Sequence, residues 1–434
     1  MAHFAIVSPP LAGHLNALQA LGTHLVERGH RVTVLGPADA RRWIWPASAI
    51  GFATIGETTH PPGSVEAVSH RMGRLRGLFG VGTMIRGLAR DTQMVARDAP
   101  AVLEQIGADA LIVDQLEPAG GVVAQGLDLP YMSVATALPI NRDPDVPPVF
   151  LGWDYRTGQR ARERNAGGHR VADWLMRAQH RVIAEAASRF GLDARARPSD
   201  WLSPVLDVSQ TVPSIDFPRA EPPRQLHHVG PLRLSQKQTL PFERDGRPLA
   251  FASLGTLQGA RLELFETIAK AVAERDHQLV LVHCGRLDRH AVSRLETDPS
   301  FGRPVVRDFV PQSAVLAQAD LAVLHGGFNT VLDALRQAVP IVVMPLAFEQ
   351  PAIAARLERA GVAQRVSPWR VRPKRITDAI DLLVHEDRLD ARLAATAIEI
   401  EEAGGASRAA DLAERILLGL NVTSLDAERA RRAR

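Results

Sequence analysis

At residues 320–330 the chain reads Asp-Leu-Ala-Val-Leu-His-Gly-Gly-Phe-Asn-Thr, a short apolar run joined directly to a helical pattern. The apolar run ends at Leu324, two glycines follow, and a helix is predicted to begin near Phe328. Backbone N–H groups at such a helix start lack intrahelical partners and can cradle an anion such as a diphosphate. The stretch therefore predicts a βα unit with an anion site at the carboxyl end of its strand.

The same alternation of short apolar strands and helical patterns runs through both halves of the chain. Strands are predicted at residues 4–8, 31–35, 52–55 and 110–113, and again at 249–253, 278–283, 321–324 and 341–344. Such alternation is typical of a parallel sheet covered on both faces. Since 434 residues exceed what one core usually holds, we expect an α/β protein of two Rossmann-like domains that face each other across a cleft.

The domain boundaries are predicted from composition. Residues 1–230 form the first domain and residues 249–420 the second. Between them, residues 231–248 contain three prolines and have little periodicity, which is typical of a linker. The basic tail, residues 421–434, is expected to be disordered.

Composition excludes several classes of protein. Apolar residues make up 46% and charged residues 23%, as in ordinary soluble globular proteins. The only cysteine is Cys284, so neither an intramolecular disulfide nor a cysteine zinc site can form. The chain has no signal-like start and no apolar run of about 20 residues, so a cytoplasmic location is expected. Arginines are scattered among nearly as many carboxylates, so no nucleic acid partner is expected.

Ser253-Leu-Gly-Thr256 ends the first strand of the second half and can supply further donors to a diphosphate. It is not a Walker loop, because no lysine follows a Gly-x-x-x-x-Gly pattern. Gly255 and Gly259 lack the dinucleotide spacing, which weakens a nicotinamide-dependent oxidoreductase as an alternative. Phe251 stands where a hydrolase elbow needs its first glycine.

Residues 309–350 resemble the donor-binding signature of the glycosyltransferase family that includes UDP-dependent glucosyltransferases. The matching residues have the family's order and spacing, and they are Phe309-Val-Pro-Gln312, His325-Gly-Gly-Phe-Asn-Thr330, Asp333, Pro340, Pro345 and Glu349-Gln350. Segments 109–120, 251–259 and 325–335 are most similar to bacterial zeaxanthin glucosyltransferases. Gly13-His14 and Asp114 stand where the family has its catalytic pair, so the resemblance spans nearly the whole chain. It implies the GT-B type of fold, with the acceptor bound by the first domain and the nucleotide sugar by the second.

The resemblance also implies roles for single residues. Phe309 stands where plant members have tryptophan and offers the uracil a smaller stacking face. Asp333 replaces the glutamate that many members use to bind the ribose, and His325 matches the phosphate-binding histidine. Glu349 and Gln350 match the pair that binds sugar hydroxyls. The expected donor-site residues are Ser253, Thr256, Phe309, Val310, Gln312, His325, Gly327, Asn329, Thr330, Asp333, Glu349 and Gln350.

His14 and Asp114 are the expected catalytic residues. A hydroxyl acceptor needs a base with a pKa near neutrality, and histidine has a reference pKa of about 6.5. Asp114 ends a buried-looking strand, where an unpaired carboxylate would be costly, so a histidine partner would explain it. The alternatives are a surface or capping role for His14 and a helix N-cap for Asp114.

No metal and no other cofactor is expected besides UDP-glucose as co-substrate. Asp143-Pro-Asp145 resembles the Asp-x-Asp metal motif of a different glycosyltransferase fold, but its prolines favour a turn. His283-Cys284-Gly285 closes a strand, and a core or loop role is favoured there over metal binding or nucleophilic attack.

The resemblance implies an inverting enzyme that transfers glucose from UDP-glucose to the hydroxyls of zeaxanthin or a related carotenoid, giving mono- and then diglucosides. The alternatives are a transferase for another apolar acceptor, such as a macrolide, sterol or flavonoid, and a nucleotide-sugar-binding protein without activity. A lipid-dissolved acceptor implies peripheral contact with the cytoplasmic face of the membrane, through residues 78–85 or the aromatics between Phe150 and Trp174. The alternative is an enzyme that collects its acceptor from another protein.

Overall fold

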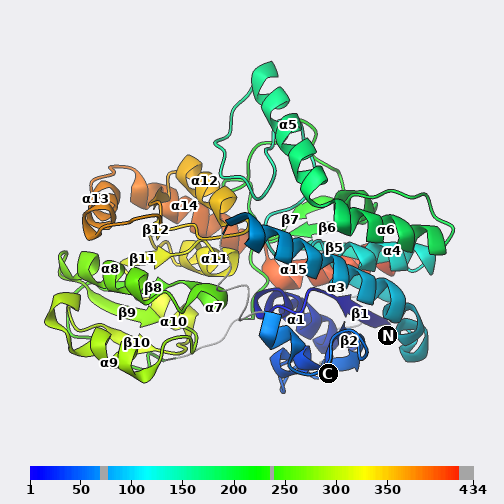
Figure 1. Ribbon diagram of the computed structural model, residues 1–434, viewed down its shortest axis with the longest axis horizontal. Helices are drawn as coiled ribbons and strands as arrows, with labels where there is room; N and C mark the ends of the chain where they lie inside the picture. Colours follow the sequence, from blue (N-terminus) through cyan, green and yellow to red (C-terminus); the bar gives the residue numbers. More distant parts are fainter. Residues whose placement is uncertain (69–76, 235–238, 420–434) are drawn as a thin grey trace, which may run out of the picture.

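The computed structural model describes residues 1–68, 77–234 and 239–419, with side chains at 77–81 excepted. Two parallel sheets lie side by side, each covered by helices (Figure 1). The predicted α/β architecture of two Rossmann-like domains is confirmed. All eight predicted strands are present, with ends that differ from the prediction by at most one residue.

The first sheet has the strand order β3-β2-β1-β4-β5-β6-β7, with every pair parallel. Its central strands are fully buried apolar runs, as expected for a sheet covered on both faces. The strands are β1 His3–Val7, β2 Arg31–Gly36, β3 Gly51–Thr54, β4 Ala110–Asp114, β5 Tyr131–Ala135, β6 Asp207–Ser209 and β7 Leu226–His228. The helices are α1 Ala12–Glu27, η1 Ala38–Trp43, α3 Gly77–Ile106, α4 Pro118–Gly126, α5 Gln159–Leu175, α6 Arg177–Arg189 and η2 Pro198–Trp201.

The second sheet has the order β10-β9-β8-β11-β12-β13, also with every pair parallel. Its strands are β8 Leu249–Ser253, β9 Gln278–Val282, β10 Val305–Arg307, β11 Leu321–Leu324, β12 Ile341–Val343 and β13 Ala363–Arg365. The helices before the chain returns to the first domain are α7 Gly255–Gln258, α8 Leu262–Ala273, α9 Arg289–Thr297, η3 Pro299–Phe301, α10 Gln312–Leu316, α11 Phe328–Arg336, α12 Gln350–Ala360, α13 Pro373–Val384 and α14 Leu389–Glu402.

The last described helix, α15 (Gly405–Leu417), packs on the first domain. Its apolar stripe shares one core with Leu15 and Leu18 of α1. Glu414 accepts hydrogen bonds from Arg28 Nη1 at 2.7 Å and from His30 Nε2 at 3.0 Å. The expectation that residues 249–420 form one domain is therefore wrong at its C-terminal end, because the burial of this stripe joins α15 to α1.

The expected linker is also partly built into the first domain, since Leu232 is fully buried in the same core as α15. The basic tail at residues 421–434 lies outside the described residues. Within the described residues, no helix has the length and apolar character that crossing a membrane requires.

Candidate active site

A cavity of about 2300 Å³ lies between the two domains. Its walls come from the loops that follow β1, β4 and β5 in the first sheet and β8, β11 and β12 in the second. The carboxyl ends of both sheets thus converge on one space, which is where open α/β sheets bind ligands. The cavity is lined by His14 and by all twelve of the expected donor-site residues. Asp114 is fully buried directly behind His14.

The expected catalytic pair is in hydrogen-bond contact. His14 Nδ1 lies 2.8 Å from Asp114 Oδ2, across 100 residues of sequence. The Thr136 hydroxyl, which follows β5, lies 2.7 Å from each of these two atoms. When Asp114 accepts the Nδ1–H of His14, the lone pair of the imidazole is on Nε2.

The N-cap alternative for Asp114 is not what the structure has. Asp114 Oδ1 accepts the backbone N–H of Leu116 at 2.9 Å, but helix α4 begins four residues after Asp114. The N-cap of α4 is Glu117, whose side chain accepts from the N–H of Ala119. Asp114 therefore uses one carboxylate oxygen to fix its own loop and the other to hold His14 and Thr136.

The electrostatic surroundings of His14 favour its protonated form. Burial lowers the pKa of His14, but the charge and hydrogen bond of Asp114 and the charge of Glu349 outweigh it, so the pKa is raised. Glu349 follows β12 and acts on His14 from the second domain. Burial raises the pKa of Glu349 in turn, while the neighbouring His14 lowers it.

His325 is held at the end of β11 by its backbone surroundings. Its Nδ1 lies 3.2 Å from the carbonyl oxygen of Ser253, to which it donates, and burial lowers the pKa of His325 to about 4. A Cβ on either Gly255 or Gly327 would come within 2.5 Å of His325 Nε2. The Nε2 edge of the His325 imidazole therefore lies in a narrow slot between Gly255 and Gly327, and a larger residue at either position would clash with it. Gly327 is also the N-cap of α11, and the residues of the first turn line the cavity. The N–H groups of a first helical turn lack intrahelical partners.

Asn329, in the first turn of α11, spans the two domains. Its Nδ2 donates to the carbonyl oxygen of Gly13 at 2.8 Å, and its Oδ1 accepts from Gln210 Nε2 at 3.2 Å. In this arrangement the Asn329 side chain is engaged by the first domain, next to the loop that carries His14. We therefore expect Asn329 to contact a diphosphate through its backbone N–H rather than through its side chain.

The expected ribose ligand Asp333 is also already engaged. Arg233 Nε donates to Asp333 Oδ1 at 3.0 Å, and Gln312 Nε2 donates to Oδ2 at 2.7 Å. Thr330 in turn donates to Gln312 Oε1 at 3.2 Å. Phe309 is 69% exposed at the cavity wall, so its ring has a free face.

Gln350 shapes the loop that carries Glu349. Its Oε1 accepts the N–H groups of Leu346 and Ala347 at 2.8 and 2.9 Å. The carboxamide oxygen is thereby used within the loop, so Gln350 can reach a sugar hydroxyl with its NH₂ group. Ser253, at the end of β8, accepts the N–H of Gly255 on its hydroxyl at 3.2 Å.

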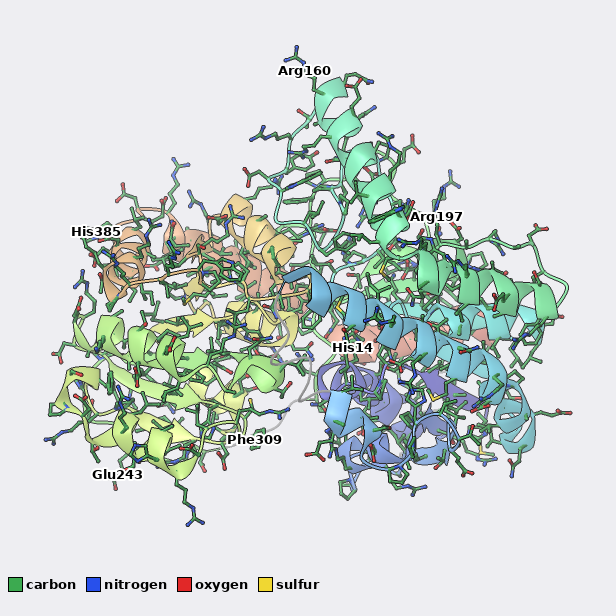
Figure 2. The ribbon with its side chains drawn as sticks, in the orientation of Figure 1. His14, Arg160, Arg197, Glu243, Phe309 and His385 are labelled. Atoms are coloured by element: carbon green, nitrogen blue, oxygen red, sulfur yellow. The ribbon has the colours of Figure 1, made fainter. Side chains whose placement is uncertain are left out.

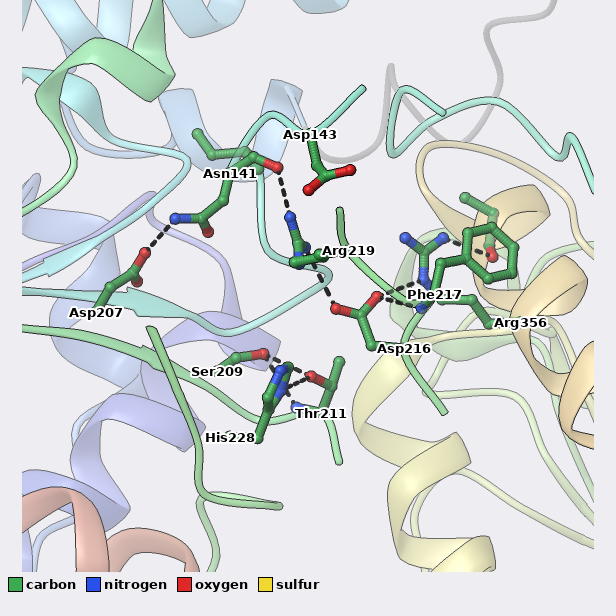
Figure 3. A network of polar contacts seen from close by, with 12 residues as sticks. Asn141, Asp143, Asp207, Ser209, Thr211, Asp216, Phe217, Arg219, His228 and Arg356 are labelled. Atoms are coloured by element: carbon green, nitrogen blue, oxygen red, sulfur yellow. Dashed lines mark hydrogen bonds and ion pairs between the residues drawn. The ribbon is translucent and has the colours of Figure 1, made fainter. Parts of the chain in front are cut away.

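A buried polar network ties α12 to the acceptor side (Figure 3). Arg356 Nε donates to Asp216 Oδ1 at 3.0 Å, with its guanidinium 4.2 Å from the Phe217 ring centre. Arg219 contacts Asp216 at 3.3 Å and donates to the carbonyl oxygen of Asn141 at 2.8 Å. Because α12 begins at Gln350, the network connects the helix that follows Glu349 to the loop that contains Asn141.

The Asp143–Asp145 segment forms a turn. Asp143 accepts the N–H of Asp145 on Oδ1 at 2.8 Å, and Asp145 pairs with Arg162 at 2.7 Å. The His283 side chain pairs with Asp308 at 3.0 Å, and burial raises the pKa of the Cys284 thiol to about 11. Among the described residues, no group of three or more histidine, cysteine or acidic side chains could hold a metal ion. The interpretation of residues 143–145 as a turn is confirmed.

Sequence reasoning missed Thr136, Gln210 and Arg233. Each makes its contact with a residue about 100 or more positions away, and none lies in a recognisable motif. No local pattern could have singled them out.

Comparison with known proteins agrees with this geometry. Residues 227–390 match the family described as UDP-glucoronosyl and UDP-glucosyl transferase. A zeaxanthin glucosyltransferase of Pantoea ananas is 42% identical over 421 residues, which cover 96% of each chain. The chain belongs to this family of transferases. A zeaxanthin glucosyltransferase of Pseudescherichia vulneris is 38% identical, covering 96% of this transferase and 99% of its own length.

Solved structures show the same two-domain GT-B fold. The glycotransferase of kitacinnamycin superposes with a TM-score of 0.75 at 24% identity, covering 95% of this transferase and 98% of its own chain. The calicheamicin glycosyltransferase superposes with a TM-score of 0.73 at 22% identity, covering 97% and 99%. The predicted GT-B type of fold is confirmed.

Proposed function

We propose that this transferase moves glucose from UDP-glucose to a hydroxyl of zeaxanthin, giving the β-glucoside at one end of the carotenoid and then at the other. The observation that carries the proposal is the His14–Asp114 pair, which faces the donor-site residues across one cavity. The full-length similarity to the two zeaxanthin glucosyltransferases supports this choice of acceptor.

In the proposed reaction, His14 Nε2 removes the proton of the acceptor hydroxyl as its oxygen attacks the anomeric carbon. Asp114 keeps the imidazole oriented through Nδ1–H and stabilises the imidazolium that forms. Attack from the face opposite the nucleotide converts the α-linkage of the donor into a β-linkage. UDP leaves with its diphosphate against the N-terminus of α11, where backbone N–H groups stabilise the departing charge.

The donor is held without a metal in this proposal. Phe309 stacks on the uracil, Asp333 accepts from the ribose, and His325 with the backbone of α11 faces the diphosphate. Glu349 and the NH₂ group of Gln350 bind the sugar hydroxyls. The support for these roles is that all five residues line the same cavity as His14.

The acceptor end of the cavity suits a long apolar molecule. Its lining includes Leu116, Ile140, Val149, Phe150, Trp153 and Met176. A carotenoid can place one ring hydroxyl at His14 while its polyene extends along this wall. The same geometry accommodates the second hydroxyl after the molecule is released and rebound in the opposite direction.

The acceptor is dissolved in lipid, so the enzyme is proposed to act at the cytoplasmic surface of the membrane. Peripheral contact suffices, since the acceptor needs to expose only its hydroxylated end to the cavity. Uptake of the acceptor from another protein is the competing route.

Incubation with UDP-glucose and detergent-dispersed zeaxanthin, followed by chromatography and mass spectrometry, tests the proposal. Mono- and diglucosides should appear in that order, with β-configuration by NMR. A macrolide, a sterol and a flavonoid serve as competing acceptors. Efficient transfer to one of these and none to zeaxanthin would reject the carotenoid, and UDP-glucose binding with no transfer to any acceptor would reject an enzyme.

A further inference from the structure

Helix α5 carries an exposed apolar stripe. Its buried side consists of small residues at helical spacing, which are Ala161, Asn165, Gly168 and Ala172. On the opposite side, Val171 is 59% exposed and Trp174 is 62% exposed. The helix projects from the body of the molecule, at the top of the view in Figure 1. Two large apolar side chains on a projecting helix cost free energy in water unless another surface covers them.

Positive charge is concentrated on this helix, the residues just before it and the start of α6. Residues 156–181 contain seven arginines and two acidic residues, a formal charge of +5, whereas the whole chain carries only +3. The rest of the chain is therefore slightly acidic. Arg160, at the outer end of α5 in Figure 2, Arg170 and Arg181 are exposed and form no ion pair with any described residue.

The apolar and basic residues occupy one face of α5. Arg160, Arg170, Val171 and Trp174 are separated by helical spacings that place them within one stripe. The guanidinium of Arg177, just past the helix, lies 4.6 Å from the centre of the Trp174 ring. Aromatic and aliphatic side chains flanked by arginines are the composition of helices that lie in the interface of a membrane.

The stripe adjoins the acceptor end of the cavity. Residues 167–173 of α5 line the cavity, and so does Phe150, which is 41% exposed. Gly168 allows Trp153 to pack closely on the helix, because a Cβ there would lie 2.9 Å from the indole ring. The base of α5 is therefore fixed to the loop that forms the apolar wall.

We propose that α5 docks this transferase on a bilayer that contains anionic phospholipid. Val171 and Trp174 enter the interface, and Arg160 and Arg170 meet the lipid phosphates. The cavity then opens beside the membrane surface, so a carotenoid end can enter it directly. The benefit of docking rests on the proposed function, in which the acceptor is dissolved in lipid. The docking itself does not depend on which acceptor is used.

Two other surfaces fit a membrane less well. Helix α13 exposes Leu382 and Val384, but its two basic residues are balanced by two acidic ones. In α3, Ile85 is buried and Met84 lines the cavity, while residues 78–81 have no described side chains. Of the two segments expected from the sequence to reach the lipid, the one that includes Trp174 is therefore favoured.

Flotation of the full chain with phosphatidylcholine vesicles, with and without phosphatidylglycerol, tests the docking. The wild type should float with the anionic vesicles and far less with the neutral ones. Replacing Arg160 and Arg170 by glutamine should weaken partitioning about thirty-fold, from the loss of two charges at an anionic surface. The variant Val171→Ser/Trp174→Ser should weaken it about tenfold or more. The matched controls Leu382→Ser/Val384→Ser and Arg289→Gln/Arg388→Gln alter exposed side chains of the second domain and should float as the wild type does.

Activity separates docking from the proposed function. The single variants Arg160→Gln and Trp174→Ser alter α5 residues outside the cavity lining. Each should keep the wild-type rate on detergent-dispersed zeaxanthin and lose rate on zeaxanthin in anionic vesicles. A wild type that does not float, or α5 variants that float as well as the controls, would overturn the docking. Flotation that depends on α5, together with no transfer to dispersed zeaxanthin, would uphold the docking and reject the acceptor instead.

Discussion

Arg233 Nε lies 3.0 Å from Asp333 Oδ1, which ties the segment after the first sheet to helix α11 of the second domain. Gln312 completes the arrangement by donating to the other carboxylate oxygen at 2.7 Å. The aspartate is one methylene shorter than the glutamate of many family members, and these two donors hold it in place. Each carboxylate oxygen still has a lone pair for a ribose hydroxyl.

If Asp333 binds the ribose 2′-hydroxyl, its loss should remove the preference for UDP over 2′-deoxy-UDP. Asp333→Asn should weaken UDP binding about tenfold to a hundredfold, as expected for a hydrogen bond to a charged group. Binding of 2′-deoxy-UDP should change much less, which calorimetric titration of both nucleotides would measure.

Arg233→Gln is the control, because it removes one donor that positions the Asp333 carboxylate and leaves the carboxylate itself in place. It should weaken UDP binding and keep some preference for the 2′-hydroxyl, because Gln312 still holds Asp333. An unchanged ratio of the two affinities in Asp333→Asn would remove the ribose contact from the proposal.

The His14–Asp114 contact predicts both a loss of rate and a shift with pH. His14→Ala should lower turnover by about 10²- to 10⁴-fold, the usual contribution of a general base, while UDP binding is largely retained. The base must be neutral, so kcat/KM should rise as pH rises through the pKa of His14, which Asp114 raises. Asp114→Asn should move this acid limb to lower pH and also lower the plateau.

The pH profile of kcat/KM for wild type and Asp114→Asn measures the shift. Glu349 still raises the pKa of His14 in the variant, so part of the upward shift should remain. An acid limb that stays in place or moves to higher pH would contradict the pairing, and near-wild-type turnover of His14→Ala would exclude this residue as the base.

The sequence predicted the strands whose residues are nearly all apolar, such as Leu249–Ser253 and Leu321–Leu324. It missed Tyr131–Ala135 and Asp207–Ser209 inside the first sheet. It also missed short strands at the sheet edges, because Leu226–His228 and Ala363–Arg365 contain too many polar residues to stand out. Such strands form because a neighbouring strand offers hydrogen bonds, which is a tertiary effect. The path of α15 was missed for the same reason, since the amphipathic pattern shows that a helix is buried but not against which domain.

The residues of the candidate site likewise include some that the sequence predicted and some that it missed. His14, His325 and Asp333 were found because they stand in motifs or at predicted strand ends, and the fold brings them to one cavity. Thr136 and Arg233 were not found, because a threonine or arginine in a loop has no spacing that distinguishes it. Thr136 meets His14 and Asp114 only when the first domain folds, and Arg233 meets Asp333 only when the two domains are assembled.

Gly327→Ala should impair the donor site through His325. The added methyl group would approach His325 Nε2 to 2.5 Å, and because φ at this position is not in the left-handed region the clash is the main effect. UDP binding should weaken by about tenfold or more, since the imidazole must move away from the phosphate position. Calorimetry with UDP measures the loss, and thermal unfolding shows whether the fold is intact.

Gly87→Ala is the matched control, because a Cβ there meets nothing within 4 Å and the residue lies in the interior of α3. It should bind UDP like the wild type and be equally or slightly more stable. Equal UDP affinity in Gly327→Ala and Gly87→Ala would show that the slot around His325 does not matter for the donor.

Chelators should leave the rate unchanged, because the diphosphate is proposed to be neutralised by backbone N–H groups and neutral donors. Rates are compared after dialysis against EDTA and after adding back magnesium or manganese. Loss of activity in EDTA with recovery on metal addition would contradict the proposal. Asp143→Asn and Asp145→Asn would then be tested as ligand variants, although the turn and Arg162 already engage both carboxylates in this structure.

Arg356→Met should destabilise the protein, because it removes a partner of the buried Asp216 carboxylate. Breaking a buried pair from one side costs about 3–5 kcal/mol, and the stacking on Phe217 is lost as well. Arg356→Met/Asp216→Asn removes both charges and should recover part of the loss in stability.

The exposed pair of Arg336 and Glu401 gives the control, since Arg336→Met should cost less than about 1 kcal/mol. Urea unfolding measures each variant, and KM for UDP-glucose shows whether α12 still positions Gln350. If Arg356→Met is no less stable than Arg336→Met, the buried network does not hold the two domains together.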